Sequence, residues 1–241
     1  MPLQLFETVP AATTRDDAET IIALIADAAA SADARVLESQ VAAGFGRVFT
    51  IVEPAEGRTP ELARAVHERL GGRVAEIAGP HAVRLVGADI DDIRATAGRA
   101  EYLVEWDIPA EIDMDAYLTR KKANAPKYAE VPEVSFLRTY VREDTQKCLC
   151  FYDADTEAAV RNARDVVSTP ISRLHELDGA ATTASSTTGW RCSNTSMLPP
   201  PFACRSRRST ASWFPSARPA RPGSSVGIDA DCGNVEGQVA R

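Results

Sequence analysis

The segment LESQVAAGFGRVFTIVEP, residues 37–54, has a counterpart in LRTYVREDTQKCLCFYDA, residues 137–154. In each segment apolar and polar residues alternate on both sides of a turn, which is the pattern of an antiparallel β-hairpin. The two segments are one hundred positions apart and align without a gap. Self-similarity at a fixed distance is typical of a duplicated structural unit. We therefore expect two copies of one small fold in this chain.

The elements around the first hairpin fit a unit of four strands and two helices. A strand is predicted at residues 3–9, and apolar residues then recur at helical spacing over residues 18–29. After the hairpin, Thr59-Pro60-Glu61 begins a second helix that Gly71-Gly72 ends, and a last strand covers residues 74–86. This βαββαβ order is expected to fold as a four-stranded antiparallel sheet with both helices on one face.

The second copy follows the same plan, so we predict an α+β fold of two tandem ferredoxin-like units, at residues 1–88 and 99–179. The predicted elements are strands at 102–108, 134–141, 148–152 and 171–177 and helices at 113–125 and 156–167. A bare sheet face in each unit would expose roughly several hundred Å² of apolar surface. We therefore expect the copies to cover each other as an internal pseudo-dimer that forms an α+β barrel, or to pair in a homodimer.

Residues 180–241 differ from the rest in composition, because Ser, Thr, Pro and Arg dominate and no apolar period persists. We predict a disordered tail, either a basic recruiting segment or an extension not selected to fold. Residues 181–241 hold seven Arg, no Lys and three acidic residues, a net of +4, which leaves residues 1–180 at −11 of the total −7. An acidic body argues against nucleic-acid binding.

No stretch reaches the roughly 18 consecutive apolar residues that cross a bilayer, and the first residues lack an export signal. We expect a cytoplasmic protein without a membrane partner. Five cysteines then do not indicate a disulfide framework. Cys148 and Cys150 lie two apart and share one face of a strand, either as small buried side chains or as a thiolate pair for a soft metal.

Period-two alternation assigns side chains to the two faces of each predicted sheet. The helix-covered face of the second hairpin is expected to carry Leu137, Thr139, Val141, Leu149 and Phe151. Its open face is expected to carry Phe136, Arg138, Tyr140, Cys148, Cys150 and Tyr152. The open faces should also carry Glu7, Glu38, Gln40 and Glu105. Stacking the copies would then bring the three carboxylates towards Arg138 and Tyr140.

Three interpretations of this charged interior remain open. A Glu–Arg ion pair would fix the register of the two copies, since a buried charge requires a partner. A small-ligand cleft would use Arg138 to hold an anionic group and Tyr140 or Glu105 to relay a proton. The other predicted ligand-binding residues are Gln40, Cys150 and Tyr152. An oxygen-rich divalent-metal site would use Glu7, Glu38 and Glu105. No catalytic residue is assigned.

Several stretches also resemble a known family. They are Tyr102-Leu103-Val104-Glu105-Trp106, Leu137-Arg138-Thr139-Tyr140-Val141, Cys150-Phe151-Tyr152-Asp153-Ala154 and Glu157-Ala158, followed by Pro170 and Arg173. The chain is similar here to small bacterial ferredoxin-like proteins, grouped as a domain of unknown function, whose characterised member binds nickel. The resemblance covers residues 100–177 and is faint over residues 3–87. It implies an α+β barrel and binding of nickel or another divalent metal.

One departure from the family affects the nickel prediction. Family members often place a His in the first strand of the hairpin, where this chain has Arg138 and, in the first copy, Glu38. A guanidinium cannot ligate a metal. The leading hypothesis is a protein that binds a small ligand or a divalent metal. The alternative is a cofactor-independent monooxygenase or isomerase of the dimeric α+β barrel type, an analogy of fold alone.

Overall fold

The computed structural model describes residues 2–96 and 99–178, in which one order of elements, βαββαβ, occurs twice. The first half contains β1 (Leu3–Pro10), α1 (Arg15–Ser31), β2 (Ala34–Val41), β3 (Val48–Pro54), α2 (Thr59–Leu70), the 3-10 turn η1 (Gly71–Arg73) and β4 (Val74–Val86). A short helix, α3 (Ile90–Thr96), follows. The second half contains β5 (Tyr102–Asp107), α4 (Met114–Asn124), η2 (Ala125–Glu130), β6 (Val134–Arg142), β7 (Lys147–Ala154), α5 (Glu157–Val166) and β8 (Arg173–Glu176).

All eight strands belong to one antiparallel sheet, in the order β2-β3-β1-β4-β6-β7-β5-β8. Each half therefore has the same internal strand order, and β4 pairs with β6 to join them, with Leu85 opposite Tyr140. The two edge strands also approach each other through an isolated bridge between Ala42 and Leu177. The Ala43 N–H donates to Glu176 O at 2.7 Å beside this bridge. The two halves thus pair with each other within one chain.

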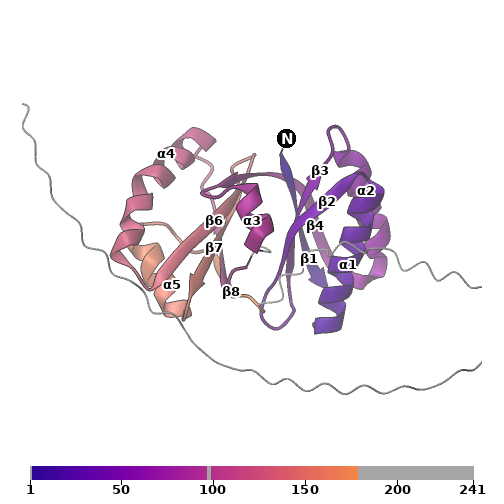
Figure 1. Cartoon of the computed structure of the whole chain (residues 1–241), viewed down its shortest axis with the longest axis horizontal. Helices are drawn as coiled ribbons and strands as arrows, with labels where there is room; N and C mark the ends of the chain where they lie inside the picture. Colours follow the sequence, from indigo (N-terminus) through magenta and orange to yellow (C-terminus); the bar gives the residue numbers. More distant parts are fainter. Residues whose placement is uncertain (1, 97–98, 179–241) are drawn as a thin grey trace, which may run out of the picture. The chain divides into compact units, whose positions relative to one another are not determined.

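The helices begin where the sequence supplies side-chain caps. Thr14, Asp113 and Thr156 accept hydrogen bonds from backbone N–H groups in the first turns of α1, α4 and α5. Such caps satisfy N–H groups that have no partner inside the helix. Figure 1 shows α1 and α2 covering one face of the first-half strands and α4 and α5 covering one face of the second-half strands.

The three largest apolar clusters of the described residues fill the layers between these elements. One cluster packs α1 and α2 against Phe6 and Val52 of the first half. Another packs α4 and α5 against Val104, Trp106 and neighbouring strand residues of the second half. The third joins the inner sheet faces of both halves and includes Leu5, Phe49, Ile51, Leu103, Tyr140, Leu149 and Phe151. The inner cluster makes the halves mutually dependent, because each covers apolar side chains of the other.

The predicted faces of β7 are wrong. Leu149 and Phe151 lie on the inner face between the halves, whereas Cys148, Cys150 and Tyr152 lie under α4 and α5. The cause is the pairing of β6 with β7, in which Tyr140 is opposite Leu149 and Thr139 is opposite Cys150. Directly opposite residues of antiparallel strands share a face, so an error of one residue in register exchanges the faces of a whole strand.

The other predicted inner residues of β1, β2 and β5, and Arg138 and Tyr140 of β6, lie on the expected face. Phe136 does not, because it is opposite Tyr152 and packs in the helix-side cluster, while Leu137, predicted under the helices, packs in the inner cluster. The register of β6 and β7 shifts between Phe136 and Arg138, which exchanges the faces of these two residues. Glu7 and Gln40 are both opposite Phe49, and Glu38 is opposite Ile51, a member of the inner cluster. Glu105 is opposite Leu149. The predicted disordered tail, residues 180–241, lies outside the described residues. Among the described helices, none has the length and apolar character needed to cross a membrane.

Candidate functional site

A buried ion pair connects the two hairpins at their equivalent positions. Arg138 Nε donates to Glu38 Oε1 at 2.9 Å, and its Nη2 donates to Glu38 Oε2. The residues are 3% and 1% exposed, so both charges are removed from water. The two-point contact between guanidinium and carboxylate is the strong form of this interaction. The structure thus contains the Glu–Arg pair on which one of the three interpretations depends, and its role in fixing the register stays a prediction.

Two further inner side chains bond to the same carboxylate. The Tyr140 hydroxyl donates to Glu38 Oε1, and Gln40 Nε2 donates to Oε2 at 2.9 Å. Burial, and then the Glu38 carboxylate, raise the pKa of Tyr140 well above its ordinary value. Tyr140 therefore stays a hydrogen-bond donor near neutral pH. The predicted ligand-binding residues Arg138, Tyr140 and Gln40 do come together, around Glu38.

A cavity of about 580 Å³ borders this cluster. Its lining residues include Arg138 and Leu137 from β6, Arg99 and Glu101 before β5, and Ala88 before α3. Arg138 Nη1 donates to the Arg99 carbonyl oxygen at 3.3 Å, which ties the cavity wall to the ion pair. The volume is within the roughly 300–1,000 Å³ range of small-molecule sites.

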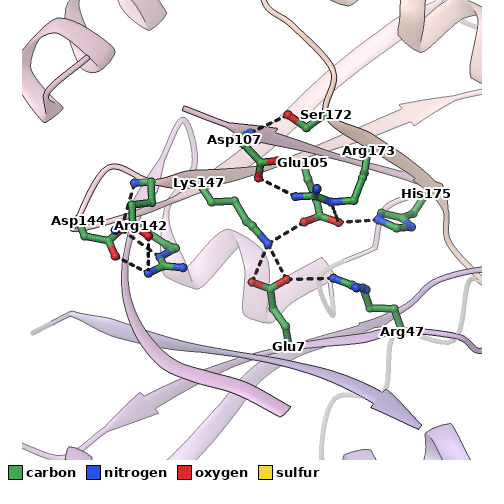
Figure 2. A network of polar contacts seen from close by, with 11 residues as sticks. Glu7, Arg47, Glu105, Asp107, Arg142, Asp144, Lys147, Ser172, Arg173 and His175 are labelled. Carbon is green, nitrogen blue, oxygen red and sulfur yellow. Dashed lines mark hydrogen bonds and ion pairs between the residues drawn. The ribbon is translucent and has the colours of Figure 1, made fainter. Parts of the chain in front are cut away.

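A second charged network joins the halves through Lys147 (Figure 2). Lys147 Nζ lies 3.1 and 2.9 Å from the two Glu7 oxygens and 2.9 Å from Glu105 Oε2. Arg173 Nε and His175 Nε2 lie 3.0 and 2.7 Å from Glu105 Oε1. The protein's own cations therefore contact Glu7 and Glu105, two of the three carboxylates that the sequence proposed as metal ligands.

Glu105 is fully buried but remains ionised. Burial raises its pKa, but the contacts with His175, Arg173 and Lys147 together outweigh burial and hold the pKa well below its ordinary value. A carboxylate held by these cations is a weak base, which is unfavourable for the predicted proton relay through Glu105.

The residues present do not fit a nickel ion. Among the described residues, no group of three or more His, Cys, Asp or Glu side chains is placed to hold a metal, so Glu7, Glu38 and Glu105 do not form the predicted site. Glu38 is bound by Arg138, and Glu7 and Glu105 are bridged by Lys147. A divalent ion would have to displace these cations.

A different cluster forms around Cys150, between β7 and the two helices of the second half. Cys150 Sγ lies 3.8 Å from Cys148 Sγ. The Thr139 hydroxyl donates to Cys150 Sγ at 3.2 Å. Both cysteines are 1% exposed. We call the site formed by Cys148, Cys150, Thr139, Lys121 and Arg164 the thiolate pocket.

Two cations approach Cys150 from different helices. Arg164 of α5 donates from Nη1 to Cys150 Sγ at 3.5 Å and to Tyr152 Oη at 3.3 Å, and its Nη2 donates to the Pro170 carbonyl oxygen. Lys121 of α4 donates to Thr139 Oγ1 at 2.6 Å and lies 3.9 Å from Cys150 Sγ. None of these partners is a carboxylate, although Arg164 is only 1% exposed.

This arrangement shifts the pKa values of the two cysteines in opposite directions. The hydrogen bond from Cys148 lowers the pKa of Cys150 most, burial opposes it, and Lys121, Arg164 and Thr139 add to the lowering. The bond to Cys150, followed by burial, raises the pKa of Cys148. These opposite directions favour the charged form at Cys150 and the protonated form at Cys148. Ordinary cysteine has a pKa near 8.5 and is mostly protonated at neutral pH.

A cavity of about 30 Å³ lies against the thiolate pocket. Its other walls include Trp106, Tyr117, Asn124, Ala125 and Tyr128. Ala125 is exposed, which places part of the cavity wall at the protein surface. The Tyr117 hydroxyl is buried and makes no hydrogen bond within the described part of the chain. The pocket therefore combines a thiolate, cations and a buried hydroxyl beside a small space.

The sequence analysis named Cys150 and Tyr152 as candidate ligand-binding residues but predicted them on the inner face of the sheet with Arg138. They lie on the face covered by α4 and α5. Lys121 and Arg164 were missed because their helices meet β7 only in the tertiary structure. One signal was present in the sequence. Val160, Ala163 and Arg164 have the i, i+3, i+4 spacing of a buried helix face, and an arginine on such a face needs an anionic or polar partner.

Comparisons with solved structures give low identities. A protein proposed to be a chlorite dismutase is 11% identical, covering 73% of this chain and 95% of that chain, with a TM-score of 0.46. A Lactobacillus acidophilus protein proposed to be a monooxygenase is 10% identical, covering 76% and 95%, with a TM-score of 0.45. An anthrone oxidase-like protein is 11% identical, covering 73% and 91%, with a TM-score of 0.41.

A search of curated proteins found no match. A family model described as "Nickel responsive protein SCO4226-like" matches residues 102–177, less than half of the chain. This segment contains every lining residue of the cavity at the thiolate pocket. The second half of the chain thus matches the nickel-responsive family that its sequence resembles.

Proposed function

We propose that this chain is a small-ligand binding protein and that its ligand is a small electrophile captured at the Cys150 thiolate. The observation that carries the proposal is Arg164, a 1% exposed cation that donates to Cys150 Sγ and makes no ion pair with a carboxylate among the described residues. A buried charge is costly unless it is paired, so a negative charge at Cys150 is favoured beside it. The thiolate supplies that charge and is also the reactive form of cysteine.

The proposal predicts a thiolate signal at neutral pH. Thiolates absorb near 240 nm, and we expect the folded protein at pH 7 to lose about one thiolate of absorbance when Cys150 is replaced by Ser. Cys148→Ser is the matched control, because a serine hydroxyl at this position still donates to Cys150. Equal absorbance of wild type and Cys150→Ser at pH 7 would contradict the proposal.

Capture of an electrophile is tested with methyl methanethiosulfonate, a small thiol reagent. We expect the modification, located by peptide mass mapping, to reach Cys150 before Cys148. Preferential reaction at Cys148, or no reaction at either residue in the folded protein, would contradict capture at Cys150. The mapping also separates these sites from Cys192, Cys204 and Cys232.

Nickel binding, which the family match raises, is not supported by the donor chemistry. Cys148 and Cys150 provide only two sulfur donors, and Lys121 and Arg164 place two positive charges beside them. A divalent ion is disfavoured next to these two positive charges. Elemental analysis of protein purified without a histidine tag is the direct test of a bound metal.

A second candidate ligand site is the 580 Å³ cavity beside Arg138. Its lining residues include Arg99 and Arg138 together with Asp92, Glu101 and Asp153. A ligand complementary to this wall carries both an anionic and a cationic group, as an amino acid does. Of the predicted ligand-binding residues, Arg138 lies on the wall of this cavity, and Tyr140 and Gln40 hydrogen-bond to its partner Glu38.

Filling the cavity tests this candidate. We expect Ala88→Phe to abolish any rise in melting temperature produced by free amino acids, because the new ring occupies the space lined by Ala88. Ala55→Phe, at an exposed loop residue, is the control and should retain the response. If no amino acid raises the melting temperature of the wild type, this second candidate fails.

The monooxygenase or isomerase alternative requires a group that exchanges a proton near neutral pH. Neither inner candidate does so, because the pKa of Tyr140 is raised and that of Glu105 is lowered. The inner charges are therefore better explained as a structural network. Binding at the thiolate pocket is the function that the geometry favours.

We also propose that the fold arose by duplication of one βαββαβ unit. The repeated βαββαβ order and the shared internal strand order support two tandem ferredoxin-like units derived by duplication. Pairing of β4 with β6 makes them an internal pseudo-dimer.

A further inference from the structure

We propose that the ligand of the thiolate pocket is a hydroperoxide, with Cys150 as the peroxide-reactive cysteine and Cys148 as the cysteine that resolves it. This inference rests on the proposed function and names its substrate class. It follows from the groups that surround the sulfur, the size of the adjacent cavity and the position of the second thiol.

The groups around Cys150 suit attack on an O–O bond. Thr139 donates a hydrogen bond to the sulfur at 3.2 Å, while Lys121 Nζ donates to Thr139 Oγ1 at 2.6 Å. This chain of donors orients the Thr139 hydroxyl towards the thiolate. Arg164 contacts the same sulfur from the other helix. As the O–O bond breaks, negative charge moves from sulfur to the departing oxygen, and the cations of Lys121 and Arg164, 3.9 and 3.5 Å from the sulfur, stabilise negative charge in this pocket.

The cavity matches a ligand of two heavy atoms. A water molecule needs about 10–15 Å³ of such volume, so the observed 30 Å³ accommodates roughly two water-sized centres. Hydrogen peroxide has two oxygen atoms and fits this space. The cavity therefore accommodates the smallest of the common cysteine oxidants directly beside the sulfur.

The chemistry is balanced with peroxide as the oxidant. The Cys150 thiolate attacks one peroxide oxygen, forming the S–O bond of a sulfenic acid, and the O–O bond breaks to release hydroxide, which takes a proton to become water. The Cys148 sulfur then attacks Cys150 Sγ, its thiol proton leaves with the sulfenic hydroxyl as a second water, and a disulfide forms. In total two thiols are oxidised and one peroxide is reduced to two waters.

Cys148 is placed for the second step. Its sulfur is 3.8 Å from that of Cys150, and both side chains point to the same face of β7. Disulfide formation requires the sulfurs to approach to about 2.05 Å, which side-chain rotation and a small shift of the strand must supply.

The test is reaction of the full-length protein with one equivalent of hydrogen peroxide at pH 7. Free cysteine is only a few per cent thiolate at this pH, and a stabilised thiolate loses part of its nucleophilicity, so we expect Cys150 to react at least ~10-fold faster than free cysteine. Mass mapping should show a Cys148–Cys150 disulfide, with Cys192, Cys204 and Cys232 still reduced.

Single substitutions test the role of each residue in the reaction with peroxide. Cys148→Ser should stop at a Cys150 sulfenic acid that dimedone traps, and Cys150→Ser should abolish the fast reaction. Lys121→Met should slow it several-fold, because it removes one cation and the partner of Thr139. Lys122→Met, at an exposed residue of the same helix, is the matched control and should leave the rate unchanged.

Two results would overturn the inference. One is a rate equal to that of free cysteine, and the other is fast oxidation that maps to Cys192, Cys204 or Cys232. Modification of Cys150 by methyl methanethiosulfonate without fast reaction with peroxide would reject the peroxide and keep the proposed electrophile site. Failure of both reagents at Cys150 would reject both proposals.

Discussion

Replacing Arg138 by Ala is expected to lower the free energy of unfolding by about 3–5 kcal/mol. The substitution leaves the Glu38 carboxylate buried at 1% exposure without the guanidinium that binds both of its oxygens. Tyr140 and Gln40 still donate to Glu38, but neutral donors do not replace a positive charge. Chemical denaturation followed by circular dichroism measures the loss.

Two further variants test whether the loss of stability comes from leaving the buried Glu38 charge without a partner. One breaks an exposed ion pair, and the other removes both buried charges. Arg161→Ala breaks a pair whose side chains are 54% and 52% exposed, and we expect a loss below about 1 kcal/mol. Glu38→Leu combined with Arg138→Met removes both charges and should recover most of the stability lost by Arg138→Ala. If the double variant is as unstable as the single one, the uncompensated Glu38 charge is not the cause of the loss.

Replacing Glu105 by Gln is expected to cost about 3 kcal/mol at pH 7, because it leaves Lys147 and Arg173 without the shared carboxylate. The loss should depend on pH. The contacts hold the pKa of Glu105 below its ordinary value when folded, and an unfolded Glu has a pKa near 4.3. The carboxylate therefore contributes stability above about pH 4.3, and this contribution disappears as the pH falls towards the folded pKa.

Unfolding measured from pH 7 to pH 3 tests this dependence. The difference between wild type and Glu105→Gln should be constant from pH 7 to about pH 5 and shrink below about pH 4. Glu157→Gln, at the exposed pair with Arg161, should show only a small difference throughout. A difference between wild type and Glu105→Gln that grows in acid would contradict the lowered pKa.

Much of the architecture is predictable because the same sequence pattern occurs in both halves of the chain. The gapless alignment of residues 37–54 with 137–154 identifies the hairpins and places Glu38 and Arg138 at equivalent positions. Equivalent positions on facing sheets meet near the axis that relates the two halves. The contact between Glu38 and Arg138 follows from that relation, since the opposite charges need each other once buried.

The faces of β7 were not predictable from alternation alone. Alternation relates residues within one strand, but the relation between β6 and β7 depends on the turn that joins them. Pairing Val141 with Cys148, as observed, places the cysteines under the helices. Pairing Val141 with Leu149 would place them inside, as the sequence analysis assumed.

The thiolate pocket has no equivalent in the first half. Val48 and Thr50 stand at the positions of Cys148 and Cys150. Val66, eight residues after the N-cap of α2, stands where Arg164 follows the N-cap of α5, and it packs in an apolar cluster. Two identical subunits would carry two copies of any reactive centre. The two halves of one chain can differ in sequence, so the proposed reactive centre occurs in one half alone.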